Sequence, residues 1–348
     1  MTSSLFFTII SSGGIIWVNL DCWGGIFLAV ITVVGSLNMA IVIRAPRQPR
    51  QGETLLGRNF GVTGGGKGSN QALAVARLGA ESHMVGCVGK DDFGRRLRSV
   101  LMEDGVDCQY MEERSEAGTG VGIITVTDEG ESAIIFVQGA NALLDEADLD
   151  RAEKVISASD ALLFQMEIPS RTVAAGLRMA RRMGKRTFLS AEPPFSLPSD
   201  AWSYIDCLIL NEKALNFYIE NVPDPRSEKE PVLLSDEEIA QRARQILDRG
   251  VRNVVVTQSA RGGMVFSQER SFSFDPFKVH VVDNTGARDA FCAGLCVGLA
   301  EGMPIAKAAR FASAAGALAC TRIGAHPSLP WRRDVEDLLE ETAGDYAG

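Results

Sequence analysis

The sequence predicts an α/β fold with a mostly parallel central sheet, and three observations lead to this prediction. From residue 161 onward, short β-branched runs alternate with segments of helical periodicity, which is typical of βαβ units. Hydrophobic residues make up 46% of the 348 positions and charged residues 23%, as in ordinary globular proteins. A chain of this length is best accommodated as one large domain with a small addition.

The first half of the chain begins its core with the β-branched run Phe27–Gly35, which predicts a fully buried strand. A polar loop is expected next, through Pro46 and Pro49, and Gly61–Asn70 is expected to be a glycine-rich loop. The elements predicted after it are helix 71–78 stopped by Gly79, strand 84–88, helix 93–103, and strands 120–127 and 132–138 joined by a hairpin turn.

The second half predicts strands and helices in regular alternation, as parallel pairing requires. We expect Asn221–Ser235, which is rich in proline and charge, to be a surface loop. The predicted strands are 161–165, 186–190, 207–210 and 253–257, and the predicted helices are 170–183, 236–248, 289–301 and 305–321.

Residues 1–26 are interpreted as an N-terminal extension before a domain over 27–340, with 341–348 as a tail. No Lys or Arg precedes Arg44, so the extension lacks the basic start of a secretory signal. Asn19, Asp21 and two glycine pairs interrupt its apolar stretches, which argues against a membrane helix.

The net charge of −9 argues against binding of nucleic acid or an anionic membrane through bulk charge. It leaves room for a small phosphorylated ligand held locally. The 7 cysteines are scattered and the 3 histidines are far apart, so we expect free thiols and no zinc or haem site. These features predict a cytoplasmic protein, or a nuclear one if the chain is eukaryotic.

The glycine-rich loop nearly matches a phosphate-binding Walker A motif, with Gly61 and Gly66-Lys67 in place. The next position must carry a hydroxyl for Mg²⁺, and here it is Gly68. A mobile surface loop is one interpretation. We favour a ligand site, because successive glycines before a helix expose backbone N–H groups.

A second candidate site is Val281–Gly294, where a strand, a Thr-Gly-Ala turn and a helix follow one another. Asp289 lies at the start of this helix, where N–H groups favour negative charge. An ordinary helix cap would explain the aspartate alone. The glycine turn before it and the small residues after it favour a general base for phosphoryl transfer.

A third set of polar residues follows predicted strands directly: Glu167, Asn211 and Thr257. Ligands bind at the carboxyl ends of strands in such sheets. The set therefore predicts a binding crevice along that edge.

Residues from about 33 to 339 resemble the ribokinase-like (PfkB) carbohydrate kinase family, because several motifs occur in family order and at family spacing. The motifs are GSLN (35–38), GGKGSNQA (65–72), VGKDDFG (88–94), TGVGIITV (119–126), GAN (139–141), ILNE (209–212), VVVTQSARG (254–262) and CTRIGAHPSLPW (320–331). The resemblance implies a ribokinase-like sheet flanked by helices, with a small β lid from parts of 38–64 and 118–140.

Site roles follow from the resemblance by position. The sugar would be bound by Asn38, Gly66, Lys67, Gly68, Ser69, Asn70, Glu167 and the base Asp289, and the anion hole would be Gly286, Ala287 and Arg288. ATP would be bound by Asn211, Thr257, Gln258, Ser259, Ala260, Arg261, Gly262, Arg288 and Ser313. A monovalent cation would lie among Asp283, Thr285, Ala319, Arg322, Gly324 and Ser328.

The activity implied is ATP-dependent phosphorylation of D-ribose at its 5-hydroxyl to ribose 5-phosphate and ADP. Mg²⁺ would arrive with ATP, K⁺ would be the monovalent activator, and two copies would pair through the lid. Two alternatives stay open, namely a kinase for a nucleoside or another pentose, and a weakly active or inactive sugar- or nucleotide-binding relative.

Three departures from the family pattern motivate the alternatives. Ala40 replaces an acidic residue that contacts the sugar, and Ala214 replaces the glutamate of the N-x-x-E motif. Arg288 replaces a glycine at the anion hole, where backbone freedom and small size matter. The arginine would either bind the phosphates or block them.

Overall fold

The computed structural model describes residues 6–11, 14–19, 28–129, 131–220 and 233–342. Residues 1–5, 12–13 and 20–26 of the predicted extension, the start of the predicted first strand at Phe27 and most of the loop 221–235 lie outside the described residues. Two strands within the extension, β1 (Phe6–Ser11) and β2 (Gly14–Asn19), pair with each other in antiparallel fashion.

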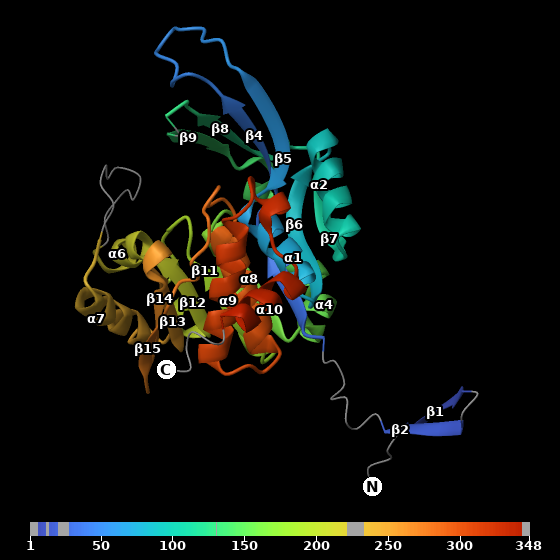
Figure 1. The fold of residues 1–348 in the computed structure, drawn as a ribbon. Helices are drawn as coiled ribbons and strands as arrows, with labels where there is room; N and C mark the ends of the chain where they lie inside the picture. The colour runs from blue at the N-terminus through green and yellow to red at the C-terminus, as the bar shows by residue number, and fades with distance from the viewer. Residues whose placement is uncertain (1–5, 12–13, 20–27, 130, 221–232, 343–348) are drawn as a thin grey trace.

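The predicted α/β fold with a mostly parallel sheet is confirmed (Figure 1). Nine strands lie in the order β15-β14-β13-β12-β11-β10-β3-β6-β7. Pairings from β13 through β7 are parallel, and β14 and β15 add an antiparallel edge. The bounds are β3 Val30–Val34, β6 Glu81–Gly89, β7 Val106–Arg114, β10 Ala161–Gln165, β11 Arg186–Ser190, β12 Cys207–Asn211, β13 Asn253–Thr257, β14 Gly263–Ser267 and β15 Ser271–Phe274.

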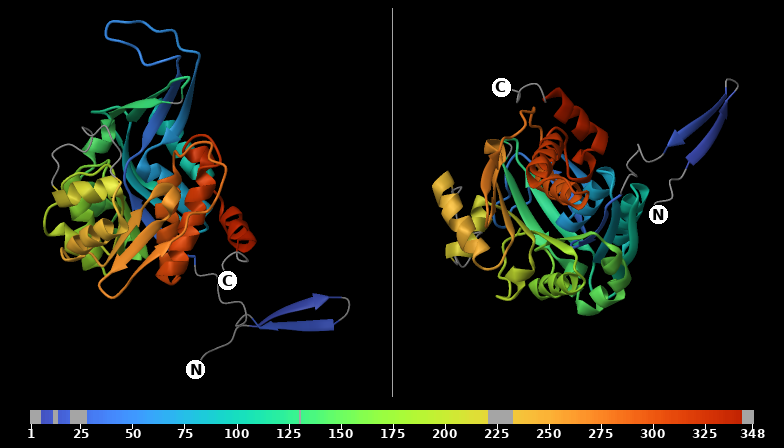
Figure 2. Two further views of the ribbon diagram at one scale, coloured as in Figure 1. Left: turned by 60° about the vertical axis from the view of Figure 1, so that its left-hand side comes forward. Right: turned by 90° about the horizontal axis from the view of Figure 1, so that it is seen from below.

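Helices cover both faces of this sheet, as the view from below shows (Figure 2). Each face has its own apolar core, because strand side chains alternate between them. In β10, Leu163 belongs to one core and Leu162 and Phe164 to the other. The helices of the first core are α1 Lys67–Arg77, α2 Asp92–Glu103, α8 Ala287–Ala300, α9 Ile305–Ala319 and α10 Arg332–Glu341. Those of the second are α3 Glu146–Arg151, α4 Glu153–Ala158, α5 Ser170–Arg182, α6 Glu212–Glu220 and α7 Asp236–Leu247.

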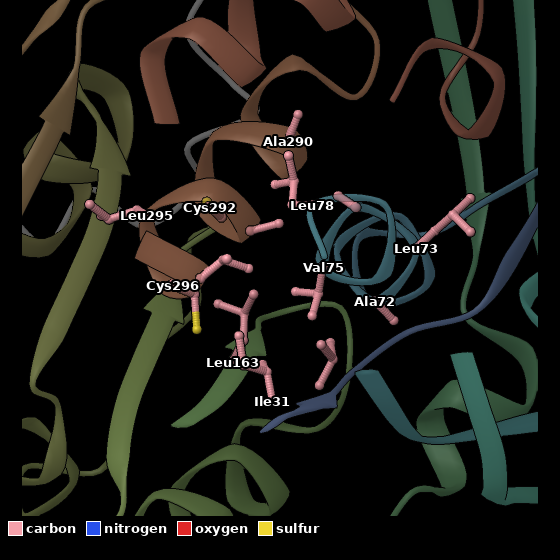
Figure 3. Packing of buried hydrophobic residues seen from close by; sticks show 14 of the residues in the cluster. Ile31, Ala72, Leu73, Val75, Leu78, Leu163, Ala290, Cys292, Leu295 and Cys296 are labelled. Carbon is pink, nitrogen blue, oxygen red and sulfur yellow. The ribbon is translucent and has the colours of Figure 1, made fainter. Parts of the chain in front are cut away.

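Helices α1 and α8 pack side by side on the sheet, and their small residues permit a close approach (Figure 3). Ala72 and Val75 of α1 and Ala290 and Cys292 of α8 are fully buried in the same core. This packing brings the N-terminal ends of the two helices together, and both predicted catalytic motifs begin there.

A second, four-stranded sheet has the order β5-β4-β8-β9 and extends away from the main body in Figure 1. Its strands are β4 Asn38–Arg44, β5 Asn59–Gly65, β8 Gly120–Val126 and β9 Ser132–Val137. The hairpin predicted for β8 and β9 is confirmed.

The predictions of a polar loop directly after Asn38 and of a loop over Gly61–Asn70 are wrong. Asn38–Arg44 and Asn59–Gly65 pair as antiparallel strands, and α1 begins at Lys67. Glycines lower the local propensity to form strands, but here pairing with a neighbouring segment outweighs this low propensity.

Most predicted elements occur within a few residues of their observed ends, and three strands (β10, β11, β13) match in full. The elements that were not predicted are β1, β2, β7, α3, α4, α6, β14, β15 and α10. The short strand predicted before the Thr-Gly-Ala turn is wrong, because residues 281–283 form no strand. Throughout the described residues, every helix is too short or too polar to span a bilayer.

Candidate active site

A polar cage surrounds Glu167, which lies two residues beyond the carboxyl end of β10. Its Oε2 accepts hydrogen bonds from Ser36 Oγ (2.6 Å), Asn38 Nδ2 (3.2 Å) and the Lys67 amide (3.1 Å). Among the described residues no hydrogen bond is made to Oε1. The cage therefore fixes the carboxylate and leaves one oxygen for a ligand hydroxyl.

Close backbone contact at the start of α1 makes this cage possible. A Cβ on Gly68 would lie 2.5 Å from the Ser36 amide nitrogen and 2.6 Å from the Gly35 carbonyl carbon. Gly66 has a φ of 94°, in the left-handed region. The glycines of the predicted sugar motif thus bring the β3–β4 connection onto the first turn of α1.

Asp289 is held by the first turn of α1 and does not cap its own helix. Its Oδ2 accepts from Asn70 Nδ2 (2.7 Å) and its Oδ1 from Gln71 Nε2 (2.9 Å). Gln165 Nε2 in turn donates to Gln71 Oε1 (2.6 Å). The carboxylate is 5% exposed, yet each oxygen keeps a lone pair for a further donor. Burial raises the pKa of the neighbouring Cys292 thiol to about 12, so this group stays protonated.

Helix α8 begins with a left-handed turn at Gly286, whose φ is 82°. Ser259 is the one non-glycine with positive φ in the described chain, so Arg288 has ordinary helical backbone. The left-handed backbone conformation that favours glycine therefore occurs at position 286 and not at position 288. Consequently an arginine fits at 288 without strain.

The side chain of Arg288 forms an ion pair with Glu192, a residue that the sequence analysis did not select. Glu192 lies two residues past the end of β11, and its side chain is 12% exposed, against 30% for Arg288. The same position relative to β10 identified Glu167. The rule that polar residues follow strand ends could therefore have found Glu192.

The predicted nucleotide residues lie at the ends of β12 and β13, where Asn211 and Thr257 are partners in the parallel register. Arg261 forms an ion pair with Glu212, 2.6 Å between nitrogen and oxygen. Gln258 Nε2 donates to Asp236 of α7 at 3.3 Å, and Ser313 Oγ donates to the Asp275 carbonyl at 3.2 Å. Gln258 and Arg261 therefore shape the segments after β12 and β13, whereas Ser313 of α9 holds the segment after β15.

Ala214, in place of the motif glutamate, is buried in the first turn of α6. Its amide donates to Asn211 Oδ1 at 2.7 Å, so the asparagine caps the helix. No described group of three or more His, Cys, Asp or Glu side chains is arranged to hold a metal ion. Bound Mg²⁺ would therefore depend on nucleotide phosphates and waters for most of its ligands.

Ser69 faces away from the cage and contacts His326 in the loop after α9. His326 Nε2 lies 3.0 Å from Ser69 Oγ, which donates to the Gly65 carbonyl at 2.5 Å. His326 Nδ1 is buried without a hydrogen-bond partner among the described residues. Burial, reinforced by the charge of Arg77, lowers the pKa of His326 to about 4.

Ala319 is the last residue of α9, and the other predicted cation residues lie on two segments that hydrogen bonds join. Asp283 accepts from the amides of Gly324 (2.8 Å) and Thr285 (2.9 Å) and from the Thr285 hydroxyl (2.7 Å). Burial raises the pKa of Asp283, but these hydrogen bonds outweigh burial and the net shift is downward. Ser328 Oγ is 3.3 Å from the Thr285 carbonyl.

Comparisons with known proteins agree with this geometry. The model of the pfkB family of carbohydrate kinases matches residues 29–332. A ribokinase of Haemophilus influenzae is 33% identical over 89% of this chain and 98% of its own. The solved ribokinase of Thermotoga maritima has a TM-score of 0.79 at 32% identity, covering 90% of this chain and all of that one. The Arabidopsis thaliana ribokinase, solved with ribose and ATP, has a TM-score of 0.80 at 28% identity, covering 90% and 99%.

The fold and the site thus define a phosphotransferase of the carbohydrate kinase class. The chain belongs to the pfkB family of carbohydrate kinases, and the relatives just described are ribokinases within it.

Proposed function

We propose that this protein transfers the γ-phosphoryl group of ATP to the 5-hydroxyl of D-ribose. The observation that carries the proposal is Asp289, a buried carboxylate at the N-terminus of α8 that Asn70 and Gln71 hold beside the Glu167 cage. The relatives named ribokinase, one of them solved with ribose and ATP, support ribose as the acceptor.

The chemistry divides between two groups of residues. Asn38, Lys67 and Glu167 bind sugar hydroxyls, and Asp289 takes the proton of the 5-hydroxyl. The hydroxyl oxygen then bonds to the γ-phosphorus, the bond from that phosphorus to the β–γ bridging oxygen breaks, and ADP leaves. The N–H groups at the start of α8, from Gly286 to Arg288, stabilise the charge on the transferred group.

Two ions belong to this proposal. Magnesium enters with ATP and shields the phosphate charge, because the residues that the structure describes form no metal cage. A potassium ion is placed between the loops that carry Asp283 and Ser328, held mostly by carbonyl oxygens, where it would fix the start of α8. Activity should then rise with K⁺ concentration at constant ionic strength.

The four-stranded sheet is proposed as the lid that covers the sugar and joins two copies. Asn38 is the first residue of β4 and also contacts Glu167, so the sheet and the sugar site share a residue. All six residues of β9 are exposed, and four of them are large and apolar, from Ile134 to Val137. An exposed apolar patch of this kind marks an interaction surface.

The test is an ADP-release assay with ATP, Mg²⁺ and K⁺ across ribose, other pentoses and the nucleosides adenosine and pseudouridine. We expect ribose to be the preferred acceptor and Asp289→Asn to lower kcat by several hundredfold or more, because the general base is lost. Preference for a nucleoside would instead favour the alternative that Ala40 suggests. Ribose-independent ADP release, or none at all, would contradict the proposal.

A further inference from the structure

The ends of the central strands arrange the site in a line. Strands β10, β11, β12 and β13 are parallel neighbours, so their carboxyl ends lie in this order along one sheet edge. The polar cage around Glu167 follows β10, and the predicted nucleotide residues follow β12 and β13. The transferred phosphoryl group must pass between sugar and nucleotide, which is the position of the β11 end and Glu192.

The ion pair at this position leaves donors free. A guanidinium carries five N–H donors, and Glu192 engages Arg288 through Nη1. The structure gives Nε and Nη2 of Arg288 no hydrogen-bond partner from the described residues. Because 30% of the Arg288 side chain is exposed, a ligand can reach part of this side chain.

The charges at the start of α8 favour keeping the Glu192–Arg288 ion pair when an anion binds. The N-terminus of the 14-residue helix α8 attracts negative charge, and Glu192 alone would oppose a phosphate there. Paired with Arg288, it is neutralised and its charge no longer repels the ligand. The pair also restricts a flexible side chain, so less entropy is lost when the guanidinium binds phosphate oxygens.

We infer that Glu192 is a positioning residue that holds Arg288 so that its free N–H donors contact the phosphoryl group in transfer. The inference rests on the proposed function. It assigns the arginine at the anion hole a stabilising role, and it assigns a role to Glu192, which none of the motifs contains.

The test compares Arg288→Gly, Arg288→Lys, Glu192→Gln and the double variant in steady-state kinetics. We expect Arg288→Gly to lower kcat about 100-fold with little change in KM for ribose, since the loss of one transition-state donor has this effect. Added guanidinium ion should restore part of the activity. Glu192→Gln should lower kcat about 10-fold in wild type, because it acts through Arg288. In Arg288→Gly it should cause no further loss and should instead raise kcat, because the unpaired carboxylate that opposes the phosphate is removed.

A matched control is Arg333→Gly, also at the second position of a helix and also near a carboxylate, but 90% exposed. It should keep wild-type kcat. Activity of Arg288→Gly at or above wild type would overturn the inference, because the pair would then obstruct the anion hole. Equal, additive losses from Glu192→Gln in both backgrounds would also overturn it.

A separate measurement distinguishes failure of this inference from failure of the proposed function. If wild type phosphorylates no sugar, ribose phosphorylation is wrong, and binding of a non-hydrolysable ATP analogue relative to ADP then tests Arg288. We expect Arg288→Gly to weaken analogue binding at least 10-fold while ADP binding changes less. Equal affinity of both proteins for the analogue would refute the contact with the terminal phosphoryl group.

Discussion

The hydrogen bonds of single residues in this site depend on neighbours from distant parts of the chain. Aspartate near a helix start is an ordinary cap by local preference, but Asp289 accepts hydrogen bonds from α1 instead. Its role depends on residues more than 200 positions away in the chain. The sequence therefore predicted Asp289 as a candidate, through the glycine turn before it and the small residues after it, but not Gln71 and Gln165, which connect it to the sheet.

Arg288 is a second residue whose surroundings a sequence motif does not reveal. From the sequence, Arg288 was expected either to bind the phosphates or to block them, because the family resemblance implies a glycine at this position. The counter-charge at Glu192 changes this interpretation, and it lies on a different strand end. Such a pair is invisible to a motif, since the two residues become neighbours only after the sheet forms.

His326 gives a prediction about stability and pH. Its pKa is lowered from 6.5 to about 4 in the folded protein, so the unfolded chain binds more protons between these values. Stability therefore is fully present above pH 6.5 and falls as the pH falls toward 4, by on the order of 3 kcal/mol. Urea unfolding of wild type and His326→Gln at several pH values from 7 to 4.5 measures it.

The His326→Gln variant should have a shallower pH dependence, because glutamine does not titrate. The carboxylates, including Asp283 with its lowered pKa, contribute equally to both proteins and cancel in the comparison. Parallel pH profiles for the two proteins would show that the imidazole is not held neutral by its surroundings.

At the scale of elements, the glycine-rich stretch 61–68 shows what could be predicted and what could not. The sequence predicted a close approach of backbone to a ligand or another segment, and it missed that Gly61 and Gly64 lie within a strand. The sequence also could not show at which of these positions the structure requires glycine. Gly61 has open space around its Cα, whereas Gly66 requires a left-handed backbone and Gly68 touches backbone atoms.

Gly68→Ala should therefore disrupt the site through the position of α1. Its Cβ would lie 2.5 Å from the Ser36 amide nitrogen, and a backbone atom has no rotamer to change. We expect a loss of about 1–3 kcal/mol in stability, as for overpacking of a core. Activity should fall further than stability, because displacement of α1 moves Asn70 and Gln71 away from Asp289.

Gly61→Ala is the control for this experiment, since nothing lies within 4 Å of its added Cβ. It should change the free energy of unfolding by less than about 0.5 kcal/mol. Thermal melting together with the ADP-release assay separates the two variants. If Gly68→Ala melts and turns over like Gly61→Ala, the contact between α1 and the β3–β4 connection does not organise the site.

At the scale of the whole molecule, the central sheet and the four-stranded sheet proposed as the lid differ in how their faces are covered. The central sheet is covered by helices on both faces, whereas the lid sheet exposes apolar residues. Because side chains alternate, Asn38 and Val42 of β4 lie on one face and Ile41 on the other. The cross-strand register places Ile134 on the face of Val42 and Ile135 on the face of Ile41.

Asn38 contacts the sugar cage, so its face of the lid is the one turned toward the site and the Ile135 face is turned away. Ile135 shares this outer face with Ile41 and Ile123 through the pairing register. An exposed apolar surface is the surface expected to meet a second copy. The proposed dimerisation through the lid should therefore depend on one face of β9 more than on the other.

The pair Ile134 and Ile135 separates the two faces, because their exposures are 64% and 65% and they are adjacent in the chain. We expect Ile135→Glu to convert a dimer to a monomer in light scattering, since a charge buried at the interface without a partner costs several kcal/mol. Ile134→Glu, of equal exposure and on the site-facing side, should remain dimeric. Loss of the dimer in both variants, or in neither, would show that the outer face of β9 is not the contact between the two copies.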